Sequence, residues 1–99
     1  MRIISKKTLK DFYEQSKYSD SKSALEAWHK EVLKLEWNNP NQIKEMYRSA
    51  SIIGDEKVVF NIAGNKYRLI VSINYDAHIV FIKFIGTHKQ YDKVNIKEL

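Results

Sequence analysis

Four side chains that suit a phosphate ligand fall on one face of a predicted sheet in the second half of the chain. They are Lys57, Asn61, Arg68 and Lys83. A run that carries an imidazole and a phenol follows the last predicted strand, Thr87-His88-Lys89-Gln90-Tyr91-Asp92. Cationic groups beside an imidazole and a phenol can bind a phosphate-rich ligand and can also cleave one.

Arg68 is the main candidate for contacting a phosphate group. Its planar guanidinium can donate to two phosphate oxygens at once. A predicted tight turn lies only a few residues earlier, so a rigid hairpin would hold it. Lys83 lies between two apolar residues of a strand and is a second electrostatic candidate. The plainer interpretations are an ordinary surface arginine and a solvated strand lysine.

His88 is the candidate for proton transfer, because an imidazole titrates near neutral pH. Tyr91 follows three residues later, so a helical turn would place both on one side. Its phenol would then stack on a base, orient a phosphate or donate a proton, unless it is a core aromatic that closes the sheet. Asp92 would orient His88, cap the turn or form an ion pair. His29 and His78 are predicted to be structural or solvent-facing.

Four side chains extend the candidate binding surface. Asn61, expected opposite Arg68, would hold the guanidinium or contact RNA. Lys57 and Lys89 would add cationic contacts, and Asp92 belongs to the same set. A generic charged edge residue is the plainer interpretation of Lys57.

Three predicted strands must position these groups, near residues 57–63, 66–75 and 79–86. After Ile52 the apolar residues recur with period two, which indicates strands. Gly64-Asn65 is a two-residue hairpin signal, and Asp76-Ala77 marks the next turn.

These turns fix a register for the sheet. Asn61 pairs with Arg68, and Lys83 lies opposite Ile70, diagonal to Arg68. The apolar face then comprises Val58, Phe60, Ile62, Tyr67, Leu69, Val71, Ile73, Val80, Ile82 and Phe84. The face with Arg68 is expected to stay partly open, over an apolar floor of Val59, Ile70, Phe81 and Ile85.

The first half of the chain is predicted to be helical. The spacing of apolar residues predicts helices near 6–17, 21–36 and 40–48, the last capped by Asn39-Pro40. Ile3-Ile4 fits a short strand. We therefore expect an α+β fold, with N-terminal helices packed on one face of a small antiparallel sheet.

Composition narrows the function class. The chain has 99 residues, no cysteine and a net charge of +5 with a pI near 9.4. One domain over residues 1–99 is expected, without disulfides, metal or cofactor. No apolar run is long enough to span a bilayer and the N-terminus does not read as a signal peptide, so we expect a cytoplasmic protein. The excess of positive charge favours a negatively charged partner: nucleic acid, a ribosome surface or an acidic protein.

Two stretches resemble the core motifs of HigB-family toxins, which belong to the RelE-like superfamily. They are VFNIAGNKYRL at residues 59–69 and IKFIGTHKQYDK at residues 82–93. Their separation, the chain length and the N-terminal helices agree with that family, although the helical half matches only loosely. The resemblance covers nearly the whole chain.

The resemblance implies a toxin of a bacterial toxin–antitoxin pair. It implies cleavage of mRNA without a metal, typically on the translating ribosome, and neutralisation by a HigA-type antitoxin with a helix-turn-helix domain. Two alternatives remain open: an RNA- or ribosome-binding module without catalysis, and a protein-directed toxin of the same superfold. The presence of Arg68, His88 and Tyr91 argues against a degenerate enzyme, and the protein-directed toxins lack the Thr-His-x-x-Tyr-Asp run.

Overall fold

The computed structural model describes residues 1–54 and 56–99 and has an α+β architecture, as the sequence predicts. These described residues form four α-helices and five strands, with two short 3₁₀ helices, η1 and η2. In chain order they are β1 (Arg2–Ile4), α1 (Lys6–Tyr13), η1 (Ser16–Ser21), α2 (Lys22–Leu33), α3 (Pro40–Met46), β2 (Ser51–Ile53), β3 (Lys57–Ile62), β4 (Tyr67–Asn74), β5 (Ile79–Thr87), α4 (His88–Asp92) and η2 (Ile96–Glu98).

The sheet has the strand order β1-β5-β4-β3-β2, so β4 lies at its centre. The three predicted strands are β3, β4 and β5, and they pair antiparallel. The short predicted strand at Ile3-Ile4 is β1, which adds to β5 in parallel, so the sheet is mixed. Strand β2, which pairs antiparallel with β3, is not among the predicted strands.

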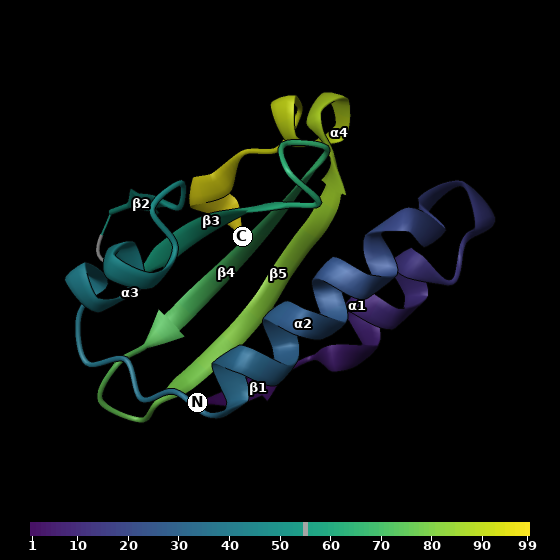
Figure 1. Ribbon diagram of the computed structural model, residues 1–99. Coiled ribbons are helices and arrows are strands. Elements are labelled where there is room, and N and C mark those ends of the chain that lie inside the picture. The colour runs from purple at the N-terminus through teal and green to yellow at the C-terminus, as the bar shows by residue number, and fades with distance from the viewer. Residues whose placement is uncertain (55) are drawn as a thin grey trace.

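The helices pack on one face of the sheet, as predicted. Figure 1 shows α1 and α2 side by side along β5 and β1, α3 on the side of β2 and β3, and α4 at the end of β5. The core lies between these helices and the sheet. It includes Leu9, Phe12, Leu25, Trp28, Val32 and Ile43 from the helices, and Val58, Phe60, Ile62, Tyr67, Leu69, Val71, Ile73, Val80 and Ile82 from the strands.

The first helix is shorter than predicted. It ends at Tyr13, and the chain continues as η1. Ser19 and Ser21 donate side-chain hydrogen bonds to the backbone carbonyls three residues earlier, at 2.9 and 2.7 Å. Such local bonds compete with the α-helical pattern, so the polar Ser16–Ser21 stretch does not prolong α1.

The face of the sheet that lies opposite the helices, the second face, is also covered over much of its area. Val59 and Ile70 on this face are 3% and 0% exposed, although they lie outside the helix-side core. The segment after α4 returns to this face, where Ile96 and Lys97 line a hollow with Lys57. Val59 and Ile70 were predicted to line a partly open face, and the structure shows that both are buried.

An aromatic cluster anchors α2 and α3 to the sheet. The Phe60 ring centroid lies 5.5 Å from that of Trp28, 6.1 Å from that of Trp37 and 5.2 Å from that of Tyr47. Aromatic pairs at these separations contribute beyond the area they bury.

We expect Phe60→Ala to lower the free energy of unfolding by about 3–5 kcal/mol, since it removes a fully buried ring and leaves a cavity. Urea unfolding followed by circular dichroism measures this change. Leu33→Ala on α2, where Leu33 is 49% exposed, is the control and should change stability by less than about 0.5 kcal/mol. Equal effects in the two variants would contradict the assigned core.

A polar cluster joins η1 to the β3–β4 hairpin. The Asp20 carboxylate accepts hydrogen bonds from the Lys66 ammonium and the Tyr67 hydroxyl. The pKa of the Asp20 carboxyl is lower than its ordinary value, mainly because of the hydrogen bond from Lys66. Burial, together with the bond to Asp20, raises the pKa of Tyr67 to about 12.

This cluster predicts a pH-dependent contribution to stability. Because the pKa of Asp20 is lower in the folded chain than in the unfolded one, its contribution is present above the unfolded pKa, about 3.9. It is lost as the pH falls through the lower folded pKa. Asp20→Asn should therefore lower the urea midpoint near neutral pH and have less effect in acid. Asp11→Asn, which removes an exposed ion pair with Lys7 at 3.4 Å, is the control and should change the urea midpoint little at either pH. An effect of Asp20→Asn on the midpoint that is the same at both pH values would refute the linkage.

Candidate active site

Arg68 lies on the second face of the sheet, opposite the helices. It is on β4, between Asn61 of β3 and Gly86 of β5. The side chain is half-buried, and its Nη1 is buried with no hydrogen-bond partner among the described residues. The guanidinium carbon lies 5.9 Å from the centroid of the Tyr91 ring. A buried cationic donor without a partner is costly, and an anion bound here would satisfy it.

Helix α4 places the phenol against this guanidinium. Thr87 caps the helix, and its hydroxyl accepts from the Gln90 N–H at 3.2 Å, while the Gln90 side-chain oxygen accepts from the Thr87 N–H at 2.9 Å. The Gln90 amide also donates to the Tyr18 hydroxyl of η1 at 3.2 Å. This capping box fixes the direction of a helix that is only five residues long.

The predicted helical turn from His88 to Tyr91 is confirmed as α4. Tyr91 is half-buried, so it is neither a core residue nor freely solvated. His88 begins the helix and is exposed, as are Lys89 and Asp92. Among the described residues no hydrogen bond or ion pair joins Asp92 to His88, so the expected orienting contact is not formed here.

Lys83 does not lie opposite Ile70, and that part of the predicted register is wrong. Strands β4 and β5 pair as predicted from the Asn74–Ile79 pair to the Val71–Ile82 pair. A β-bulge at Lys83 then shifts the register by one residue, so that Ile70 pairs with Phe84. The bulge leaves Lys83 exposed, with its Nζ 5.7 Å from the centroid of the Phe81 ring.

The shift also exchanges the faces of the two residues after the bulge. Phe84, predicted in the core, lies on the face of Ile70 and Arg68, whereas Ile85 packs against the helix-side core. A bulge adds one residue to one strand, and residues beyond it therefore alternate in the opposite phase.

Asn61 lies opposite Arg68, as predicted. Its amide donates to the Ser49 carbonyl at 3.4 Å, which ties it to the segment before β2. Lys57 lies far from Arg68. It pairs with Ser72, four residues further along β4, a separation of roughly 13 Å at the rise of a strand. Its ammonium lies 3.6 Å from Glu56, and its side chain is 13% exposed.

Three features of this region were not singled out in the sequence. The capping box of α4 was visible as Thr-x-x-Gln at residues 87–90. Gly86 leaves room for two neighbouring side chains, since a Cβ there would lie 2.6 Å from both Phe84 Cζ and Gln90 Oε1. Phe84 was assigned to the wrong face because strict alternation carries no signal for a bulge.

Most of the net positive charge lies in the part of the chain that builds this region. Residues 57–99 contain seven lysines and arginines against three acidic residues, whereas residues 1–56 contain ten against nine. Among the described residues, no group of three His, Asp or Glu side chains is placed to hold a metal ion. No described helix is both long and apolar enough to cross a membrane.

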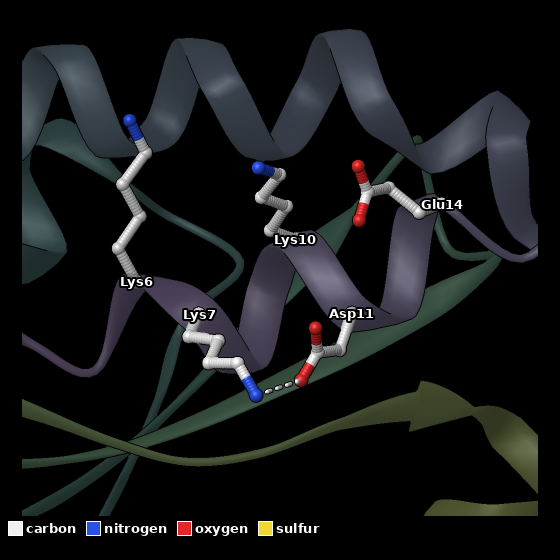
Figure 2. Close-up of a pocket in the computed structure, with 5 residues that line it drawn as sticks. All are labelled: Lys6, Lys7, Lys10, Asp11 and Glu14. Carbon is white, nitrogen blue, oxygen red and sulfur yellow. Dashed lines mark ion pairs between the residues drawn. The ribbon is translucent and has the colours of Figure 1, made fainter.

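A hollow of about 600 Å³ beside α1 is a weaker candidate. Its lining is Lys6, Lys7, Lys10, Asp11 and Glu14. Figure 2 shows Lys7 paired with Asp11 on one side of the helix, with Lys6, Lys10 and Glu14 on the other. Two carboxylates oppose three ammonium groups there, and the lining contains no imidazole or aromatic ring, so it offers a phosphate less than the Arg68 region does.

Comparisons with known proteins identify the family of this chain. The model of the HigB_toxin family, described as the RelE-like toxic component of a toxin–antitoxin system, matches residues 21–94. The chain is 31% identical over 94 residues to the mRNA interferase toxin HigB of Escherichia coli K12, an alignment that covers 93% of this chain and 88% of that protein. The mRNA interferases HigB of Escherichia coli O157:H7 and Shigella flexneri match to the same extent. The chain belongs to the HigB family of RelE-like toxins.

Proposed function

We propose that residues 1–99 act as one toxin domain that cleaves mRNA as an endoribonuclease. The observation that carries the proposal is the Arg68 guanidinium, which has a buried nitrogen without a hydrogen-bond partner among the described residues and lies against the Tyr91 ring. The names of the related mRNA interferases support the same activity.

The reaction that fits these residues is transesterification at a phosphodiester. The ribose 2′-hydroxyl loses its proton and attacks phosphorus, the phosphorane gains negative charge, and the leaving 5′-oxygen takes up a proton. Arg68 would stabilise the phosphorane, since preorganised donors aimed at developing charge supply much of a rate enhancement. His88 would transfer a proton. Tyr91 would orient the phosphate or donate a proton, and Lys83 would add positive charge from the bulge.

RNA binding would extend from this centre along α4 and the adjacent sheet edge. Asn61 pairs with Arg68 on β3, and Lys89 lies on α4; both would contact the RNA backbone, with Asp92 at the end of α4 in the same set. Lys57 would contact only RNA that extends well beyond the cleaved phosphate, because it lies at the other end of β3.

The setting of this activity is also part of the proposal. Cleavage would occur on mRNA engaged by the ribosome, in the cytoplasm and without a metal. A HigA-type helix-turn-helix antitoxin would neutralise the protein. A primer-extension assay on translated mRNA tests the function directly: specific cuts support the nuclease, inhibition of translation without cuts supports a non-catalytic ribosome-binding module, and neither effect supports a protein-directed toxin.

Arg68→Ala should lower the single-turnover cleavage rate by at least about 10²-fold, because it removes charge stabilisation of the phosphorane. Arg68→Lys should be intermediate, since an ammonium is a point charge and cannot donate in the planar fork of a guanidinium. The fold should remain intact by circular dichroism. Arg48→Ala, in the exposed turn after α3, is the charge-matched control and should keep nearly full activity, and full activity of Arg68→Ala would remove Arg68 from the mechanism.

His88→Ala should slow cleavage by roughly 10²–10⁴-fold and abolish any inflection of the rate near neutral pH, if proton transfer limits the reaction. The measurement is single-turnover cleavage on programmed ribosomes at saturating toxin, across pH. His29→Ala should do neither, since burial and the nearby charge of Lys6 lower the pKa of His29 on α2. A His88→Ala protein with an unchanged rate and pH profile would shift the role to Tyr91 or Lys83, and Tyr91→Phe would then distinguish them.

A further inference from the structure

The bulge in β5 places an aromatic ring beside the candidate active site. Beyond Lys83, Phe84 pairs with Ile70 and Gly86 pairs with Arg68, so Phe84 and Gly86 share the face of Arg68. Phe84 is partly exposed and is not part of the helix-side core. An aromatic side chain that leaves the core at this point is therefore available to a ligand.

The ring leans along the strand toward α4. A Cβ on Gly86 would lie 2.6 Å from Phe84 Cζ and 2.6 Å from Gln90 Oε1. The tip of the ring therefore occupies the space that the missing side chain leaves, between the strand and the helix that carries Tyr91. Arg68 is the cross-strand partner of Gly86, so the tip of the ring lies over the residue that pairs with Arg68.

Charge on both sides of this ring suits a polyanion. Arg68 lies across from Gly86 on one side, and Lys83 immediately precedes Phe84 in the bulge. Aromatic rings within positively charged grooves stack on the bases of single-stranded nucleic acids, while the cations contact the phosphates.

We propose that Phe84 stacks on the nucleobase next to the scissile phosphate and thereby contributes to the choice of cleavage position. This inference rests on the proposed function. It assigns the base contact to the ring and leaves the phosphate to Arg68. Stacking strength differs between bases, so Phe84 would favour the base that stacks more strongly, as such platforms give modest sequence preferences.

The test compares two phenylalanines of β5 that share one face. Phe84→Leu deletes the ring next to Gly86, and Phe81→Leu deletes a partly exposed ring that pairs with Ser72, away from α4. The measurement is primer extension on one translated mRNA with varied codons, at limiting and at saturating toxin, together with the melting temperature of each variant.

We expect Phe84→Leu to lower cleavage at the preferred positions on the order of 10- to 100-fold at limiting toxin, and to even out the preference among positions. Phe81→Leu should keep the wild-type pattern. If Phe84→Leu does not fold, Phe84→Met, which also lacks a ring but keeps a long apolar side chain, is expected to give the same result. A Phe84 variant that folds and keeps the wild-type rate and pattern would overturn this inference alone, as would equal losses in the Phe81 and Phe84 variants. A wild-type protein that leaves mRNA intact would overturn the proposed function and this inference together.

Discussion

The burial of β4 on both faces is the constraint on which the rest of the structure depends. Leu69, Ile70 and Val71 are each 0% exposed although successive residues of a strand point to opposite faces. The helices cover one face, and strands pair with β4 on both edges. A slip of one residue would expose apolar side chains on one face and bury Arg68 on the other, so packing fixes where the guanidinium emerges.

The same constraint explains why the candidate active site lies at an end of the sheet. Near Ile70 the second face is closed, and a ligand cannot approach β4 there. Toward the Arg68 end of β4 the same face is less completely covered, since Arg68 is only half-buried. The bulge at Lys83 turns Phe84 to this face, while Ile85 packs against the helix-side core. A local irregularity of β5 thus adds an aromatic ring to the face that carries Arg68.

Much of this arrangement could be predicted from the sequence, because hydrophobic alternation and turn residues determine register strongly. The pairing of Asn61 with Arg68 follows from the turn around Gly64-Asn65, and the structure confirms it. The bulge could not be predicted, since Lys83 and Phe84 fit an undisturbed alternation equally well and only the three-dimensional closure of β5 onto α4 decides between them. Strand β2 has three residues and pairs with one neighbour only, so its local pattern is too short to predict.

The geometry of the site also depends on segments that contribute no chemistry. A helix as short as α4 is not stable by itself, because helix nucleation is unfavourable and few hydrogen bonds follow it. Its orientation comes from the capping box, from the contact between Tyr91 and Arg68, and from the bond between Gln90 and Tyr18. Tyr18 in turn stacks on Phe12 of α1, with ring centroids 4.4 Å apart. The position of the phenol against the guanidinium is therefore set by a series of contacts that begins in α1, and substitutions in this N-terminal segment are expected to shift the Tyr91 ring relative to Arg68.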